Sequence, residues 1–229
     1  MGRMKRFIKK YSFTWIVFVY AAVYFRWFAW LEEHVTGEYS VIHMKIDDMI
    51  PFIEFFALPY ILWFVYIVLA VALCIIADKE SFYRAFLFLA TGMTVFLLVS
   101  TFFPNGHHLR PLVFERDNIF VSLVRLIYKS DTATNLFPSI HVYNSLGCHF
   151  ALMNTPGLKE KRWLKNSSLV TCILIILSTV FIKQHSVFDV ITAFALSAVM
   201  YPISWKIDYQ TIFAERRARR EEKKAHARA

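Results

Sequence analysis

Cysteine, glycine and proline are all scarce in this chain of 229 residues, which contains three, six and seven of them. The three cysteines are too few to frame a small disulfide-bonded fold, and all of them stand inside apolar segments: Cys74, Cys148 and Cys172. They carry no information about the redox compartment, and we expect them to pack in the interior. The apolar segments also lack the paired glycine or proline interruptions typical of transporters, so that class is disfavoured. The chain has no internal repeat.

Acidic residues are outnumbered, with 17 Asp and Glu against 26 Lys and Arg and a formal net charge of +9. The basic residues gather at both termini and in the short connections between apolar runs. We therefore expect a membrane lipid as partner and no nucleic acid. Hydrophobic residues make up 57% of the chain and occur in long runs, which is typical of a polytopic membrane protein rather than a soluble core. The predicted fold class is all-α, a polytopic membrane helical bundle.

Six apolar runs approach the ~20 residues that cross a bilayer. They are 13–30, 52–77, 86–103, 138–153, 168–182 and 187–205. The first run is longer than the apolar part of a signal peptide and lacks a small-residue cleavage site, so we interpret it as a retained transmembrane helix. The chain then divides into an N-terminal span with an external loop (1–51), a transmembrane core (52–205) and a charged tail (206–229).

The distribution of lysine and arginine predicts the orientation. The N-terminus, the connection near Lys79 and Arg84, the basic turn 159–165 and the tail carry a positive excess, and with six spans they share one side of the membrane. By the positive-inside rule both termini are cytoplasmic. The loops 31–50 and 104–137 and the turn 183–186 then lie outside. The loop 104–137 is itself basic and breaks the rule, which a binding site for an anion would explain.

One polar stretch, Asp131 to His141, leads into the fourth run. An apolar pattern begins after Pro138, so we expect Ser139 to cap a helix and His141 to lie in its first turn. The free N–H groups and the positive dipole end of such a helix attract phosphate.

Two further pieces are expected at the same membrane face: Arg110 in the external loop, and His185 with Asp189 between the last two runs. Because His185 and Asp189 are four residues apart, the carboxylate can accept a hydrogen bond from one ring nitrogen and leave the other lone pair facing outward. A carboxylate near a membrane span is costly unless it is paired. A helix cap plus an interfacial histidine is the alternative.

Taken together, these residues resemble a known family. Arg110-Pro111, then Phe137-Pro138-Ser139-Ile140-His141, then Ser178 with His185 and Asp189 are similar to the three signature motifs of the type 2 phosphatidic acid phosphatase superfamily. That superfamily includes membrane lipid phosphatases, lipid phosphotransferases and soluble vanadium haloperoxidases. The resemblance covers about residues 52 to 205, so the transmembrane core is expected to be phosphatase-like.

The resemblance implies a metal-independent phosphohistidine mechanism with no cofactor, acting on a lipid phosphate substrate at the extracytoplasmic face. His185 is the implied nucleophile, oriented by Asp189, and His141 the implied proton donor and acceptor. The implied phosphate-binding groups are Arg110, Ser139, Ser178 and the backbone N–H near Ile140.

Three positions depart from the family pattern. Phe103 and Thr179 stand where the family usually has a lysine and an arginine, and Ile140 stands where it often has glycine. If the helix through Ser178 continues to Gln184, Lys183 shares a face with Thr179 and can supply one missing cation. His107, His108 and Arg116 are the candidates for the other. Phosphotransferases of the inositol phosphorylceramide synthase type similarly relax these basic positions.

Three functions therefore remain open. The first is a membrane phosphatase that hydrolyses a lipid phosphate or diphosphate. The second is a lipid phosphotransferase that moves a phosphoryl headgroup to an alcohol. The third is a non-enzymatic membrane scaffold derived from the same fold, favoured by Phe103 and Thr179. The sequence indicates neither the acceptor nor the oligomeric state.

Overall fold

The computed structural model describes residues 10–35, 38–209, 211–212, 214 and 219. Within these residues the chain forms eight α-helices, two short 3-10 helices and two strands of two residues each. The all-α prediction is therefore confirmed. The predicted basic N-terminus up to Lys9 and most of the predicted tail 206–229 lie outside the described residues.

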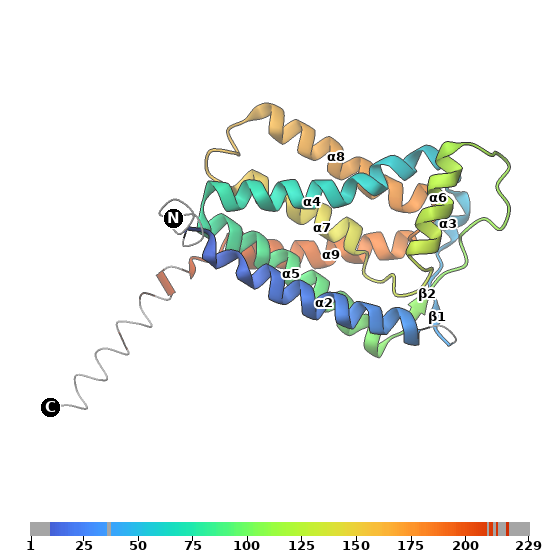
Figure 1. Ribbon diagram of the computed structural model, residues 1–229, viewed down its shortest axis with the longest axis horizontal. Helices are drawn as coiled ribbons and strands as arrows, with labels where there is room; N and C mark the ends of the chain where they lie inside the picture. The colour runs from blue at the N-terminus through green and yellow to red at the C-terminus, as the bar shows by residue number, and fades with distance from the viewer. Residues whose placement is uncertain (1–9, 36–37, 210, 213, 215–218, 220–229) are drawn as a thin grey trace, which may run out of the picture.

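Six helices run side by side and alternate in direction (Figure 1). They are α2 (Trp15–His34), α4 (Ala57–Ala77), α5 (Lys79–Phe102), α7 (Ile140–Asn154), α8 (Arg162–Phe181) and α9 (Val187–Trp205). Short 3-10 helices, Ser12–Thr14 and Glu54–Phe56, precede α2 and α4. A helix satisfies its backbone hydrogen bonds internally, which a segment crossing a bilayer requires.

Five of the described helices are long and apolar enough to cross a membrane: α2, α4, α5, α8 and α9. The fourth predicted run forms α7, which has only 15 residues. Fifteen residues rise about 22 Å, whereas the hydrocarbon core of a bilayer is about 30 Å thick. The predicted six spans are thus confirmed only as a helical bundle with five candidate spans.

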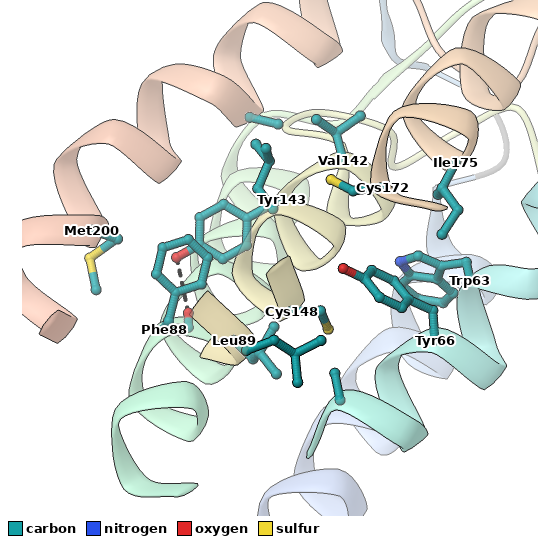
Figure 2. Close-up of a cluster of buried hydrophobic side chains, with 14 of the residues drawn as sticks. Trp63, Tyr66, Phe88, Leu89, Val142, Tyr143, Cys148, Cys172, Ile175 and Met200 are labelled. Atoms are coloured by element: carbon teal, nitrogen blue, oxygen red, sulfur yellow. Dashed lines mark hydrogen bonds between the residues drawn. The ribbon is translucent and has the colours of Figure 1, made fainter. Parts of the chain in front are cut away.

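Helix α7 lies at the centre of the bundle, packed against α4, α5, α8 and α9. Its Tyr143 ring stacks on Phe88 of α5 with centroids 4.4 Å apart and donates a hydrogen bond to the Phe88 carbonyl oxygen (Figure 2). Gly92 permits this approach, because a Cβ atom there would lie 1.9 Å from the Tyr143 ring. Trp63 and Tyr66 of α4 join the same buried cluster. This packing fixes the helix that carries Ser139 and His141 at its start.

The connections at one end of the bundle are joined to each other (Figure 1). Strand β1 (Ser40–Val41) pairs in parallel with β2 (Asn105–Gly106). Helix α6 (Ile119–Ser130) packs against the start of α4, and α3 (Lys45–Met49) lies in the loop between α2 and α4. Glu32 of α2 accepts hydrogen bonds from Thr132 and Asn135 at 2.7 and 3.0 Å. The loops 31–50 and 104–137 therefore lie together at one end of the bundle.

Candidate active site

The start of α7 has the predicted cap. Ser139 is the N-cap residue, and its hydroxyl oxygen accepts a hydrogen bond from the Val142 N–H at 3.4 Å. The Ser139 N–H donates to the carbonyl oxygen of Asp189 at 3.3 Å, which ties α7 to α9. His141 is the second residue of the helix and is 7% exposed. Capping thus places the His141 ring next to the start of α9.

The turn between α8 and α9 differs from the prediction. Helix α8 ends at Phe181, and Lys183 adopts a left-handed conformation with φ of 54°. The Gln184 N–H donates to the Thr179 carbonyl at 2.9 Å and the Lys183 N–H to the Val180 carbonyl at 3.1 Å. These two bonds define a Schellman motif, which ends a helix. The helix therefore does not continue to Gln184, and the condition for the predicted role of Lys183 is not met.

His185 follows this turn and bonds to Asp189 as predicted. The distance from His185 Nδ1 to Asp189 Oδ2 is 3.2 Å, and the same oxygen accepts from the Ser186 N–H at 3.0 Å. Both side chains are buried, with Asp189 fully so. When the Asp189 carboxylate is ionised it only accepts hydrogen bonds, so Nδ1 of His185 is then the donor, and in a neutral ring Nε2 keeps a lone pair.

That lone pair faces the other histidine rather than solvent. His185 Nε2 lies 3.4 Å from His141 Nδ1. The His141 ring also packs against Tyr60 and Trp63, with ring centroids 4.4 and 4.3 Å away. Because Nε2 of His185 accepts, Nδ1 of His141 is the donor in this contact. The arrangement is a chain in which Asp189 orients His185 and His185 faces a donor on His141.

Arg110 lies at the same end but binds protein groups. Its guanidinium donates to the carbonyl oxygens of Tyr128, Asp131 and Thr132 and to the Gln184 side chain. The guanidinium also stacks on the Tyr128 ring at 4.4 Å. Its Nε is buried and has no hydrogen-bond partner among the described residues. Arg110 is therefore bonded to Gln184, the residue directly before His185.

Lys183 does not face the two histidines in this structure. Its ammonium donates to the carbonyl oxygens of Asp47 and Ile50, at 2.7 and 2.5 Å. The left-handed turn removes the shared helical face with Thr179 on which the predicted phosphate-binding role depended. We therefore do not carry that role of Lys183 forward.

The remaining predicted residues are placed as follows. The Ser178 hydroxyl is fully buried in α8 and donates to the Ile175 carbonyl oxygen at 2.6 Å. The carbonyl of Thr179 accepts from the N–H groups of Gln184 and His185. Ile140 packs its side chain against the hydrophobic core. Ser178 thus stabilises the helix end that supports His185.

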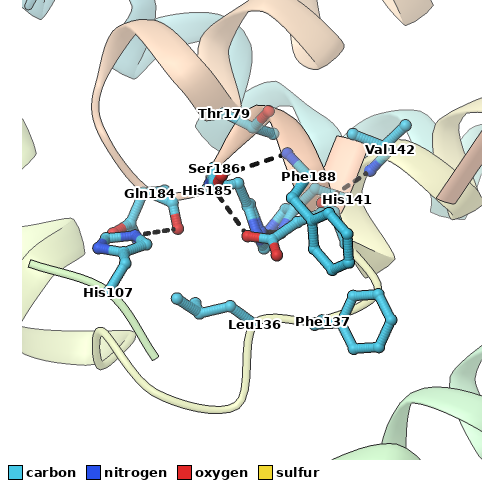
Figure 3. Close-up of polar contacts among 12 residues, drawn as sticks. His107, Leu136, Phe137, His141, Val142, Thr179, Gln184, His185, Ser186 and Phe188 are labelled. Carbon is cyan, nitrogen blue, oxygen red and sulfur yellow. Dashed lines mark hydrogen bonds and ion pairs between the residues drawn. The ribbon is translucent and has the colours of Figure 1, made fainter. Parts of the chain in front are cut away.

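Of the three candidates for a second phosphate-binding cation, one is neutral, one is paired and one is exposed. Burial lowers the pKa of His107 to about 4, so this side chain is neutral at pH 7. Its Nε2 bonds to the Gln184 carbonyl oxygen at 2.9 Å (Figure 3). Arg116 pairs with Glu54 at 3.2 Å. His108 is exposed.

Two residues at the site were not predicted from the sequence. Gln184 joins Arg110 to Asp131, and Asp47 bonds to the turn after His185. The position of Gln184 next to His185 is a signal in the sequence that could have identified it. Asp47 has no such signal, because it lies in an acidic loop without hydrophobic periodicity. Its long-range contact has no signal in a single sequence.

The two histidines are covered in this structure, with His185 only 4% exposed. A cavity of about 270 Å³ at this end of the bundle is lined by other residues, including Glu54, Arg116 and Phe114.

Comparison with family models, curated proteins and solved structures found no match to this chain. The interpretation of the site therefore rests on its residues and their geometry.

Proposed function

We propose that this protein is an integral membrane phosphatase that hydrolyses a lipid phosphate or diphosphate through a phosphohistidine intermediate. The observation that carries the proposal is the buried chain from Asp189 to His185 to His141, with contacts of 3.2 and 3.4 Å. It combines a nucleophile, a carboxylate that orients it and a donor on the neighbouring histidine that the nucleophilic nitrogen faces. The motifs that resemble the type 2 phosphatidic acid phosphatase superfamily support the same chemistry.

In the first step, Nε2 of His185 attacks phosphorus and the bond to the lipid oxygen breaks. His141 acts here as an imidazolium, protonated on both ring nitrogens in the substrate complex. Its Nδ1 gives a proton to the leaving oxygen and the ring becomes neutral, so the lipid departs as an alcohol, or as a monophosphate when the substrate is a diphosphate. The negative charge of Asp189 stabilises the positive charge that develops on the His185 ring.

In the second step, His141 takes a proton from water as the water oxygen attacks phosphohistidine 185. The nitrogen–phosphorus bond breaks, inorganic phosphate leaves, and both histidines return to their starting state. If an alcohol attacks in place of water, the same step produces a new phosphoester. The phosphatase and the phosphotransferase therefore differ only in the acceptor.

Substrate binding must separate the two rings, because 3.4 Å between nitrogens leaves no room for a phosphoryl group. The N-terminus of α7 with Ser139 and the N–H of Ile140 is the proposed cradle for the phosphoryl oxygens. Arg110 is the proposed cation, and its partnerless Nε is a group that a phosphate oxygen can satisfy.

The proposal is tested by incubating the purified protein in detergent, with EDTA, with a panel of lipid phosphates. Release of inorganic phosphate supports the phosphatase. A new phospholipid on addition of an alcohol supports the phosphotransferase. No turnover with any substrate contradicts both enzymes and leaves the scaffold. One observation favours that last candidate, since Arg110 and Lys183 are both held by carbonyl groups of the protein.

We further propose six spans, with α7 as the fourth, both termini cytoplasmic and the site on the extracytoplasmic side. Cysteines introduced at Asp117 and Glu160 test this, since both side chains are exposed. In intact cells a membrane-impermeant maleimide should label position 117, and position 160 only after permeabilisation. The native cysteines are buried and provide the background. Labelling of both positions from one side contradicts the orientation.

Replacing Asp189 by asparagine should lower kcat about 10²-fold. Asparagine can keep an oxygen where Oδ2 accepts from His185 and Ser186, so the main loss is the negative charge that stabilises the attacking ring. Steady-state kinetics on a lipid phosphate measure the effect. Asp78→Asn is the matched control, because Asp78 caps α5 and asparagine caps equally well. A wild-type kcat in Asp189→Asn contradicts the role of Asp189.

A further inference from the structure

Asp47 is a buried carboxylate that the proposed mechanism does not use. It lies in α3, in the loop between α2 and α4, and is 2% exposed. Its Oδ2 accepts from the Ser186 hydroxyl at 2.6 Å, and its Oδ1 accepts from the Val187 N–H at 2.8 Å. A third bond, from the Met44 N–H at 2.8 Å, holds the carboxylate to its own loop. The carboxylate thus sits at the N-terminus of α9, where free N–H groups and the helix dipole favour a negative charge.

Lys183 forms the other half of the same contact. It occupies the left-handed position of the Schellman motif, where glycine is the favoured residue because a side chain is strained there. Its ammonium returns to the carbonyl oxygens of Asp47 and Ile50. Burial lowers the pKa of Lys183, and the nearby carboxylates of Asp47 and Asp48 act in the opposite direction and favour its charge. A strained lysine at this position is explained by the contact that it makes.

His185 lies between these two attachments. Lys183 is two residues before it, and Ser186 and Val187, which bond to Asp47, directly follow it. The backbone of Ser186 is held from the other side by Asp189, which also accepts from the His185 ring. The orientation of the His185 side chain, which directs Nε2 toward His141, therefore depends on a turn that Asp47 holds on one side and Asp189 on the other.

We propose that Asp47 and Lys183 form a latch between the loop 44–50 and the turn 182–187, and that this latch positions His185 for attack on phosphorus. This inference rests on the proposed function. Asp47 is a positioning residue in it, since it acts through Ser186 and Val187 and touches no reacting atom. The loop 44–50, which the sequence places outside the phosphatase-like core, then contributes to the active site through Ser186 and Val187.

Three variants test the latch. Asp47→Asn keeps the size of the side chain but turns one accepting oxygen into a donor that faces Ser186 or Val187. Asp48→Asn is the matched control. It removes the neighbouring exposed carboxylate, which among the described residues hydrogen-bonds to His43, so it tests the effect of charge near Lys183 without touching the bonds to Ser186 and Val187. Lys183→Gly removes the ammonium while relieving the backbone strain, so it separates loss of the latch from loss of stability.

Each variant is measured in three ways: melting temperature in detergent, amide hydrogen exchange of the peptide covering 182–190, and kcat and KM with phosphatidic acid. We expect faster exchange at 183–188 in Asp47→Asn and Lys183→Gly. We expect kcat to fall about 10-fold or more with KM within about twofold, since small displacements of a reacting group are costly. Lys183→Gly should melt at or above the wild-type temperature, and Asp48→Asn should match wild type throughout.

Unchanged exchange at 183–188 in Asp47→Asn would overturn the latch, whatever the activity. Faster exchange with unchanged kcat would show a latch that does not position His185. A wild-type protein inactive on phosphatidic acid and the rest of the lipid phosphate panel would overturn the proposed function and the positioning claim with it. The exchange data would still decide whether the latch exists, so the two failures are distinguishable.

Discussion

Alanine at position 185 should abolish turnover, with kcat falling at least about 10⁴-fold, the scale seen when a nucleophile is removed. The ring of His185 carries the nitrogen that Asp189 orients toward His141. Steady-state kinetics on a lipid phosphate measure the loss. Wild-type protein quenched during turnover of ³²P-labelled substrate should carry an acid-labile label, and His185→Ala should carry none.

Removing the ring leaves the buried Asp189 without one partner, so His185→Ala is also expected to be less stable by about 1–3 kcal/mol. His185→Asn is the companion variant, because its amide can donate to Asp189 but cannot attack phosphorus. His43→Ala is the control, since His43 is exposed and pairs with Asp48. An acid-labile label that persists in both His185 variants would assign the nucleophile to another residue.

Alanine at position 141 should slow hydrolysis of a lipid phosphate about 10²- to 10⁴-fold, the usual range for loss of a general acid. The loss should be much smaller for an aryl phosphate, whose leaving group departs without a proton. The reason is that Nδ1 of His141 donates to the site and does not itself attack phosphorus. The measurement is kcat/KM for the two substrates in the wild type and the variant.

His149→Ala is the matched control for this comparison. His149 lies two turns further along α7 and bonds to the Ser168 hydroxyl at 2.9 Å, so its loss disturbs the same helix away from the site. It should show no dependence on the leaving group. Equal losses on the lipid and aryl phosphates in His141→Ala would contradict proton transfer by His141.

The sequence predicted those parts of the site that depend on local geometry. Ser139 caps α7, and Asp189 meets His185, because spacings of three and four residues determine contacts near a helix start. The meeting of His141 with His185 was expected from topology alone, since alternating spans bring both to one end. The phosphohistidine chemistry itself stays a prediction.

The errors arose where the backbone leaves regular structure. The turn 182–186 contains no glycine or proline, so nothing indicated that Lys183 adopts a left-handed conformation and ends the shared helical face. The Asp47 contact joins residues about 140 positions apart through an irregular loop. Such contacts follow from tertiary packing, which periodicity in a single sequence does not encode.

The shortness of α7 has a consequence for how the chain is made. A helix of 15 residues enclosed by α4, α5, α8 and α9 exposes little apolar surface of its own to lipid. A translocon selects segments by how well each partitions into lipid as it emerges. The side chains of α7 pack against neighbouring helices, so α7 alone is a poor candidate for this selection. Two of those neighbours, α8 and α9, are synthesised after it. On the proposed six-span topology, stable insertion of α7 is therefore expected to wait for the hairpin of α8 and α9, so a nascent chain has no assembled histidine pair until α9 has been delivered.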